Sequence, residues 1–456
     1  MTLKIKETLM IRPIKDTPRV TLELTRLDMI IRSPNSHTTI FFIYNPPNPS
    51  YKFDTETGKK ALSQILVPFY PLAGRLKLNA NNTRYIIDCA GQGALYVEAE
   101  TTQSLSDFGD FGPGPELRKL VIPACDYTKD LSSIPLLMGQ LTRFKCGGLC
   151  FGFALHHHVA DGASLGLFLY SLLVLYRGFD CPLQPNHDRI IHLAPRNPPQ
   201  IKYPHPEFDP PIPSFPPNGS LSGDSEKKQR LFKLTQEQID KLKQEATSQL
   251  KDKCKITRLS TYEILTAHIW RSTCKARNLS PDQEVKLYIP VDGRFVLKNP
   301  TLPDEYFGNV LLFSICTLRV SEITTMPFSY VATKVHEAVR RMNDEEYLRS
   351  AIDYLETRPE LPEPLMGFYK SMYPHLLVNS WAKMPLHLAD FGFGLPRAFG
   401  NCDIKLEGLS FLISNPSDDG LSLAINLFAD HMPLFEKNFY DTTSSCTSIL
   451  ASNGHN

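Results

Sequence analysis

A run of three histidines followed by an aspartate is the segment of the sequence best suited to chemistry. His156-His157-His158-Val159-Ala160-Asp161-Gly162 follows an apolar stretch with the pattern of a strand and precedes one with the pattern of a helix. Side chains in such a turn can meet a ligand while a rigid scaffold holds them. A neutral imidazole, with an ordinary pKa of about 6.5, is the side chain best suited to act as a base at cellular pH. We therefore expect His157 to be a functional residue.

The same run allows other interpretations. Adjacent residues of an extended chain point to opposite faces, so three consecutive histidines cannot converge on a metal ion without distortion. No other His, Cys or Asp cluster has ligand spacing, and we expect no metal site, although a metal-dependent hydrolase stays open as a rival. The apolar flanks favour a buried structural role for His156 and His158.

Composition excludes several classes of protein. The chain has 456 residues, 42% hydrophobic and 21% charged, as in ordinary globular proteins. The 49 Lys and Arg nearly balance the 48 Asp and Glu, so no basic field exists to hold nucleic acid or an anionic membrane. Residues 163–176 form a 14-residue uncharged apolar stretch near the middle of the chain, which is short of the roughly 20 residues that span a bilayer. The N-terminus lacks the apolar run of a signal peptide, and the ten cysteines are scattered. These features are typical of a cytoplasmic protein with reduced thiols and without nucleic-acid or membrane partners.

Strands and helices mix along the chain without a regular alternation. Two helices are predicted to begin with capping boxes, Thr235 with Gln238 and Ser260 with Glu263, and residues 59–70 also have a helical pattern. This order predicts an α/β fold with large mixed sheets. Strands are predicted over residues 3–13, 37–44, 85–89, 94–98, 141–144, 149–155, 286–291, 310–320, 406–414 and 421–429.

A proline-rich segment divides the chain. Residues 195–217 contain ten prolines, which remove too many backbone donors for a helix or an inner strand. The segment is expected to run extended over the surface as a semi-rigid crossover. We therefore predict an N-terminal domain over residues 1–194, a crossover over 195–226 and a C-terminal domain over 227–456.

Two motifs resemble those of a known family. His157, Asp161 and Gly162 match the HxxxDG motif of the plant BAHD acyl-CoA-dependent acyltransferases, and residues 390–394, Asp-Phe-Gly-Phe-Gly, match that family's second signature, usually Asp-Phe-Gly-Trp-Gly. The likeness covers nearly the whole chain. It is strongest to anthranilate N-hydroxycinnamoyl/benzoyltransferases, in residues 196–203 and 377–381, and then to shikimate and quinate hydroxycinnamoyltransferases. Residues 66–75, 260–263, 291–294 and 306–309 are also typical of the family.

The resemblance implies a two-domain fold like that of chloramphenicol acetyltransferase, with a channel between the domains. CoA enters this channel from one face and the acceptor from the other. His157 would take the proton of the acceptor as its nitrogen or oxygen attacks the thioester. Trp381 would donate its indole N–H to the oxyanion, a role compatible with that of a plain aromatic wall.

The two signatures also imply structural residues. In the family the aspartate at Asp161 points away from the pocket and pairs with the arginine at Arg294. Asp390 belongs to the second catalytic signature but is expected to support its loop, so that a change there impairs folding. The glycines of the two signatures, Gly162, Gly392 and Gly394, are expected to have structural roles too. The Phe393 that replaces the usual Trp is compatible with a packing role for its loop.

Ligand-binding residues follow from the same resemblance. The donor acyl-CoA, a co-substrate and not a bound cofactor, needs cations near its phosphates, and the basic segment before Ser260 supplies them. Ile40 and Phe42 stand where shikimate-type members have Ser and Tyr, and Lys383 stands where they have Arg. These replacements favour a less hydroxylated acceptor. The CoA-binding residues are thus Lys253, Lys255, Ser260 and Tyr262, with Arg258 nearby, and the acceptor-binding residues are His37, Thr38, Ile40, Phe42 and Lys383.

The sequence therefore predicts transfer of a hydroxycinnamoyl or benzoyl group from CoA to an amine acceptor such as anthranilate or a related aromatic amine. O-acylation of an alcohol or of a shikimate-like acceptor is an alternative. A non-catalytic homologue that binds acyl-CoA or a phenolic compound is a third interpretation, against which the intact His157 argues. Relatives are usually monomers, and we expect the same here.

Overall fold

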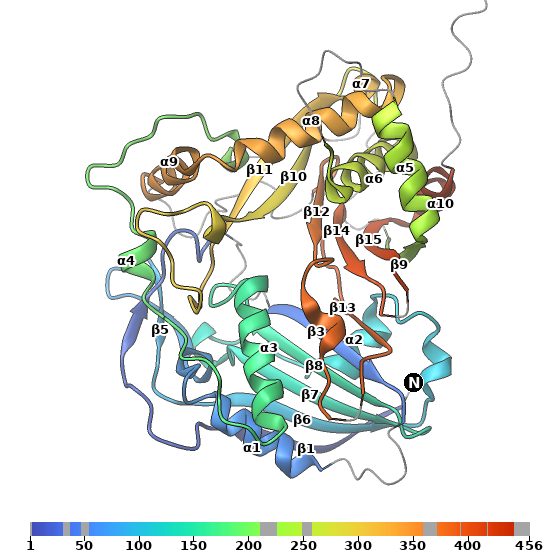
Figure 1. Cartoon of the computed structure of the whole chain (residues 1–456). Helices are drawn as coiled ribbons and strands as arrows, with labels where there is room; N and C mark the ends of the chain where they lie inside the picture. Colours follow the sequence, from blue (N-terminus) through green and yellow to red (C-terminus); the bar gives the residue numbers. More distant parts are fainter. Residues whose placement is uncertain are drawn as a thin grey trace, which may run out of the picture.

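Two six-stranded mixed sheets and a small antiparallel sheet form the framework of the molecule (Figure 1). The computed structural model describes residues 2–30, 37–46, 54–209, 226–248, 258–358, 372–392, 394–416 and 418–441. The first sheet contains, in spatial order, β1 (Leu3–Ile11), β6 (Ala94–Thr101), β7 (Leu137–Phe144), β8 (Leu149–His156), β3 (His37–Tyr44) and β13 (Ala398–Gly400). The second contains β11 (Leu311–Arg319), β10 (Glu284–Asp292), β12 (Leu376–Ser380), β14 (Leu409–Ser414), β15 (Leu421–Phe428) and β9 (Lys227–Leu234). The small sheet contains β2 (Thr21–Glu23), β5 (Tyr85–Asp88) and β4 (Arg75–Leu78).

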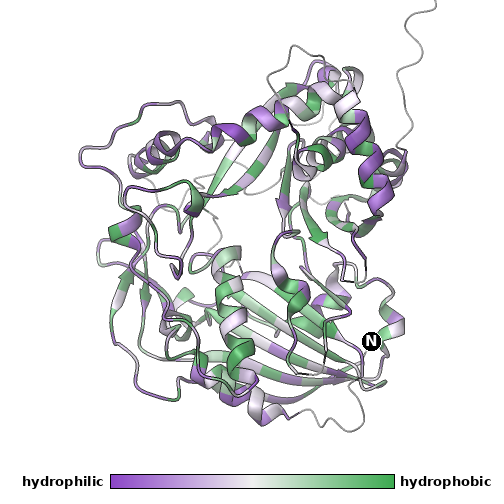
Figure 2. Ribbon diagram, viewed as in Figure 1, coloured by the Kyte–Doolittle hydropathy of each residue, from purple (hydrophilic) through white to green (hydrophobic). Residues whose placement is uncertain are grey.

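Both faces of the first sheet are covered by helices. On β8, Phe151 and Phe153 face the apolar cluster that includes α1 (Thr55–Ile65) and α3 (Gly162–Tyr176). Cys150 and Ala154, which alternate with them, face the cluster that includes α2 (Pro115–Val121). Side chains of a strand alternate between its two faces, so burial of both faces explains why this segment is a nearly continuous apolar run. In Figure 2, α3 and the strands beside it are largely green.

The second sheet is covered mainly by α6 (Thr261–Arg277), whose buried face includes Trp270 and packs in one apolar cluster with α8 and α10. The two predicted capping boxes are confirmed, since Ser260 and Glu263 bond reciprocally at the start of α6 and Thr235 and Gln238 do so at the start of α5. None of the helices within the described residues has the length and apolar character needed to cross a membrane. The remaining helices are α4 (Arg189–Leu193), α5 (Gln236–Ser248), α7 (Val320–Thr325), α8 (Phe328–Arg341), α9 (Glu345–Glu356) and α10 (Met432–Tyr440).

Most predicted elements are present, with some differences at their ends. The strand over residues 37–44 and the hairpins β7–β8 and β14–β15 are confirmed, although Ser417 in the second turn lies outside the described residues. The helix predicted over residues 59–70 begins earlier, at Thr55, because the Asp54 side chain accepts a hydrogen bond from the Glu56 N–H and caps it. It ends at Ile65, before a short 3-10 turn over Tyr70–Ala73. Several elements were not predicted, namely β2, β4, β9, β12, β13, α2, α4 and α7–α10.

The chain crosses from the second sheet back to the first near its C-terminal end. β13 pairs antiparallel with β3, Phe399 opposite Phe42, so a segment of the predicted C-terminal domain completes the sheet of the predicted N-terminal domain (Figure 1). The described part of the proline-rich crossover packs on α9, where Arg196 Nε donates to Asp353 Oδ2 at 2.7 Å. Residues 210–225 of that crossover lie outside the described residues. The division of the chain into two domains at residues 195–226 stays a prediction. The return of β13 qualifies it, because this strand belongs in sequence to the predicted C-terminal domain and in space to the sheet of the other domain.

A buried ion pair joins the two halves of the chain. Asp161 caps α3, and its carboxylate accepts from Ser164 N–H at 3.0 Å. Arg294, which follows β10, donates through Nη1 and Nη2 to the two oxygens of Asp161 at 2.8 and 2.9 Å. The same carboxylate accepts from the N–H of Val310 at 2.9 Å. Burial opposes ionisation of Asp161, but the charge and hydrogen bonds of Arg294 outweigh it and hold the pKa of that carboxyl below its usual value.

This pair predicts a large stability effect. We expect Arg294→Met to lower the free energy of unfolding by about 3–5 kcal/mol, because it leaves the buried charge of Asp161 without its partner. Chemical denaturation followed by circular dichroism measures the change.

An exposed pair serves as the matched control. Lys241 contacts Glu237 at 2.8 Å on the surface of α5, with both side chains more than half exposed. Lys241→Met is expected to cost about 0.3–0.5 kcal/mol. Equal effects of the two substitutions would contradict a stabilising role for the Asp161–Arg294 pair.

Candidate active site

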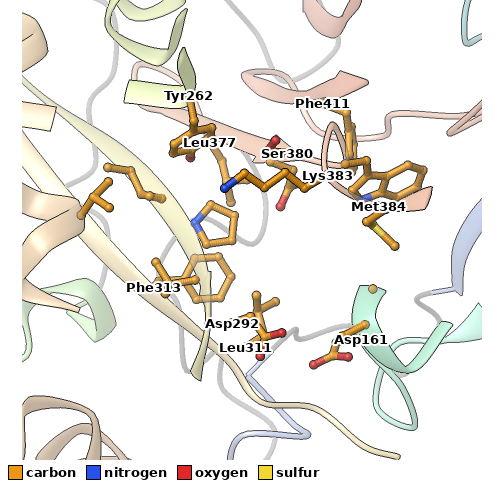
Figure 3. Close-up of a pocket in the computed structure, with 18 of the residues that line it drawn as sticks. Asp161, Tyr262, Asp292, Leu311, Phe313, Leu377, Ser380, Lys383, Met384 and Phe411 are labelled. Carbon is orange, nitrogen blue, oxygen red and sulfur yellow. The ribbon is translucent and has the colours of Figure 1, made fainter. Parts of the chain in front are cut away.

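A cavity of about 1550 Å³ lies between the two halves of the chain. The first half contributes the start of β3, the turn after β8 and the first turn of α3. The second half contributes β10, β12, the start of α6 and the segment after β12. Its walls therefore come from segments that are far apart in the sequence, and Figure 3 shows residues from several of them facing one space.

His157 lies in the turn that follows β8 and lines this cavity. Its main-chain oxygen accepts a hydrogen bond from Asn309 Nδ2 at 2.8 Å. The same Nδ2 and the N–H of Asn309 donate to Asp28 Oδ1 at 3.1 and 3.2 Å. Asp28, fully buried, also pairs with Arg189 Nε at 3.3 Å, and Arg189 donates to the oxygen of Val159 in the same turn. The backbone on both sides of the imidazole is thus fixed by a buried polar network.

The imidazole of His157 is neutral at physiological pH. Burial is the main cause that lowers its pKa below the ordinary value, and three smaller influences raise it: its own main-chain oxygen, the charge of Asp161 and hydrogen bonding by the Asn309 side chain. Nδ1 of His157 and Oδ1 of Asn309 are buried and make no hydrogen bond of normal geometry among the described residues. We assign the ring proton to this buried Nδ1, which leaves Nε2 as the basic atom.

The neighbouring histidines have other surroundings. His156 and His158 are buried, and Nδ1 of His156 accepts from the His158 N–H at 3.2 Å. The His156 ring also packs edge-on against His37 at 5.0 Å. Of the three, His157 alone is among the residues that line the cavity. Among the described residues, no three His, Cys, Asp or Glu side chains are grouped to hold a metal ion.

Trp381 follows β12 and lines the cavity with its ring packed against Phe411, at 5.0 Å between ring centres. The indole is almost completely buried. Asp161, labelled in Figure 3, borders the cavity together with Gly162 and Arg294, but its carboxylate is engaged by Arg294. The acid of the first motif therefore holds the turn in place and does not orient the imidazole as in a catalytic triad.

The second signature lies away from the cavity. Asp390 Oδ1 accepts from the N–H groups of Gly392 and Gly394 at 2.7 and 2.9 Å, which closes the loop on itself. Both glycines have positive φ angles, 99° and 109°, a conformation that side chains disfavour. Phe391 anchors the loop by stacking on Phe151 at 4.7 Å, and Phe393 lies outside the described residues. The structure thus does not bring Asp390 together with His157.

The acceptor-binding residues predicted from the sequence fall into two groups. His37 and Thr38, at the start of β3, line the cavity, and so does Lys383. Ile40 and Phe42 are fully buried in the core and do not border it, because β3 runs from the cavity into the sheet. The amino group of Lys383 points into the cavity toward Tyr262 and Leu377 (Figure 3).

The donor-binding residues predicted from the sequence are placed in part. Lys253 and Lys255 lie outside the described residues. Ser260 and Tyr262 line the cavity at the start of α6, where the Tyr262 hydroxyl donates to the Val378 oxygen at 2.8 Å. Arg258 lines it beside them. The sequence analysis missed two cations at this end, Lys243 of α5 and Arg340 of α8, because each is a single charge in a helix without a motif.

Comparison with known proteins agrees with this geometry. The model of the Transferase family matches residues 1–442. Anthranilate N-benzoyltransferase protein 3 of Dianthus caryophyllus is 49% identical over 452 residues, which cover 97% of this chain and 100% of the relative. Shikimate O-hydroxycinnamoyltransferase of Nicotiana tabacum is 44% identical over 445 residues, with the same coverage of the two chains.

Solved structures share the fold. Vinorine synthase superposes with a TM-score of 0.71 at 22% identity, over 95% of this chain and 96% of that one. F. sporotrichioides TRI101, in complex with coenzyme A and T-2, gives 0.74 at 19% identity, over 91% and 97%. The predicted α/β fold with large mixed sheets is thereby confirmed. Together with the two motifs, these relatives show that the chain belongs to the Transferase family, the acyl-CoA-dependent BAHD acyltransferases.

Proposed function

We propose that the chain transfers an aromatic acyl group, hydroxycinnamoyl or benzoyl, from CoA to an amine acceptor such as anthranilate or a related aromatic amine. The observation that carries this proposal is a neutral, backbone-anchored His157 in a cavity that both halves of the chain line. The names of the relatives support it: three at 48–49% identity are anthranilate N-benzoyltransferases, and one at 39% is a hydroxycinnamoyl-CoA:5-hydroxyanthranilate N-hydroxycinnamoyltransferase of Avena sativa.

The reaction proceeds by direct attack. The acceptor nitrogen attacks the thioester carbonyl while Nε2 of His157 takes its proton. The cavity holds both substrates, so the encounter is effectively intramolecular. The indole N–H of Trp381 stabilises the oxyanion. The tetrahedral intermediate then expels the CoA thiolate, whose ordinary pKa is about 8.5 and which recovers the proton from His157.

The phosphates of CoA bind at the end of the cavity formed by α5, α6 and α8. Lys243, Arg258 and Arg340 bring positive charge to this end. The N-terminus of α6 adds the positive end of a helix dipole over its 17 residues. Lys253 and Lys255, predicted from the sequence, belong to the same stretch of chain.

An O-acyltransferase is the second candidate, favoured by 44% identity to a shikimate O-hydroxycinnamoyltransferase. The same base would serve an alcohol. Against it, three relatives of higher identity, 48–49%, are named anthranilate N-benzoyltransferases. Supplying benzoyl-CoA or p-coumaroyl-CoA with amine and alcohol acceptors and following thiol release separates the two. Absence of thiol release with any acceptor would leave the non-catalytic interpretation. A cytoplasmic, monomeric state stays a prediction.

The imidazole of His157 should be essential for turnover but not for folding. His157→Ala is expected to lower kcat by at least about 100-fold, since a positioned general base contributes about 10²–10⁴. Thermal unfolding and CoA binding should be unchanged, and His455→Ala, a histidine near the C-terminus, is the matched control. A near-normal rate in His157→Ala would refute the assignment.

The same imidazole should set the pH dependence of kcat/KM. The base must be unprotonated, so kcat/KM falls as the pH drops through the pKa of His157, and burial places this acidic limb below pH about 6.5. Asn309→Ala removes a hydrogen-bonding neighbour that raises this pKa. Its limb should therefore move to still lower pH, together with a lower kcat from the lost backbone contact. An acidic limb above pH 7 in the wild type would contradict the lowered pKa of His157. An upward shift of the limb in Asn309→Ala would contradict the role given to Asn309.

A further inference from the structure

A second group of cations lines the cavity near the start of β3. Arg118 of α2 and Lys405, which follows β13, both border the cavity, together with Asp403. Arg118 Nη1 lies 3.6 Å from Asp403 Oδ2. The Lys405 amino group lies 5.4 Å from the centre of the Tyr127 ring and makes no ion pair among the described residues. We call Arg118 and Lys405 the distal cation pair, because they stand apart from the cations at the α5–α6–α8 end.

Asp403 offsets part of the charge of the distal cation pair. Among the described residues it is the carboxylate that pairs with Arg118, and its other oxygen accepts from Gln229 at 3.0 Å. His37, next to the pair, is neutral: Nε2 bonds to the Pro135 oxygen and must donate, so Nδ1 accepts from the Tyr127 hydroxyl. Two positive charges therefore stand beside one negative charge at this wall of the cavity, with Arg118 partly buried and Lys405 exposed.

The directions of the pKa shifts of Lys405 and His37 are consistent with an anion-binding site beside them. The pKa of Lys405 is lowered, first by burial and then by the charge of Arg118, with Asp403 acting in the opposite direction. Burial, followed by the charge of His156, likewise lowers the pKa of His37, and the charges of Lys405 and Arg118 add smaller amounts. A bound carboxylate would relieve the repulsion between the two cations.

Sheet pairing and hydrogen bonds link the segment that carries Lys405 to the strand that leads to the base. The Thr39 hydroxyl donates to the Asn401 side-chain oxygen at 3.1 Å, and the same oxygen accepts from the Asp403 N–H. Thr39 lies opposite Ala154 on β8, three residues before His157 along the chain. Arg118, Lys405 and His157 all line the one cavity, so the cations and the base face the same space.

We propose that Arg118 and Lys405 bind the carboxylate of an aromatic amine acceptor. The proposal rests on the proposed amine acylation and narrows its acceptor class to amines that carry an acid group. The arginine fork and the ammonium group both donate to the one carboxylate.

Lys383 is the competing cation. It was predicted from the sequence as an acceptor-binding residue, and it too lines the cavity. Its amino group, however, points toward Tyr262 and Leu377 (Figure 3), residues of α6 and β12. It therefore extends toward the side of α6.

The kinetic test uses benzoyl-CoA with 2-, 3- and 4-aminobenzoate and with aniline as the acceptor without a charge. In Arg118→Gln and Lys405→Met, kcat/KM for the aminobenzoates that the wild type acylates is expected to fall about tenfold or more, mainly through KM, while aniline stays within about twofold. Lys119→Gln, an exposed neighbour of Arg118 on α2, is the matched control. Equal losses for the acids and aniline, or a loss that follows Lys383→Met instead, would overturn the proposal.

A binding measurement keeps the test decisive without turnover. Saturation-transfer NMR of 4-aminobenzoate with the whole protein should show binding that both Arg118→Gln and Lys405→Met weaken and Lys119→Gln does not. Unchanged binding in the two variants would overturn the proposal. If 4-aminobenzoate binds as expected but no amine is acylated by the wild type, the proposed function fails and the distal cation pair stands.

Discussion

The site depends on one buried carboxylate that contacts three segments of the chain. Asp161 caps α3, pairs through both oxygens with Arg294 and accepts the N–H of Val310. These contacts tie the turn that carries His157 to the second half of the molecule. A charge this deeply buried is tolerable only with such partners, so the halves cannot separate without exposing it, and the cavity between them has fixed walls.

The cavity combines a neutral histidine with two groups of cations. Burial lowers the pKa of His157, while Asn309 and Asp28 fix its backbone. Lys243, Arg258 and Arg340 stand near the start of α6, and Arg118 and Lys405 stand near the start of β3. In the reaction proposed above, these cations would bind the anionic parts of the two substrates, and the imidazole would stay free to accept a proton.

Local patterns predicted much of this, and tertiary contacts account for the rest. His157, Asp161 and Arg294 belong to motifs, and the capping boxes at Thr235 and Ser260 need only residues three positions apart, so the sequence revealed them. Ile40 and Phe42 sit in a strand whose two faces are both buried, and the apolar pattern could not tell where β3 leaves the cavity. Arg118, Arg340 and Lys405 are single cations in segments without a motif. Only the packing of α2, α8 and the segment after β13 brings them to the cavity.

The return of β13 to the first sheet has a consequence for how the chain becomes a folded molecule. Residues 398–400 cover the edge of β3, and they are synthesised more than 350 residues after that edge. Until then the nascent N-terminal half presents an unpaired, apolar strand edge, a surface prone to aggregation. An isolated fragment that ends at the proline-rich crossover should therefore need its missing strand supplied in trans to stay monomeric.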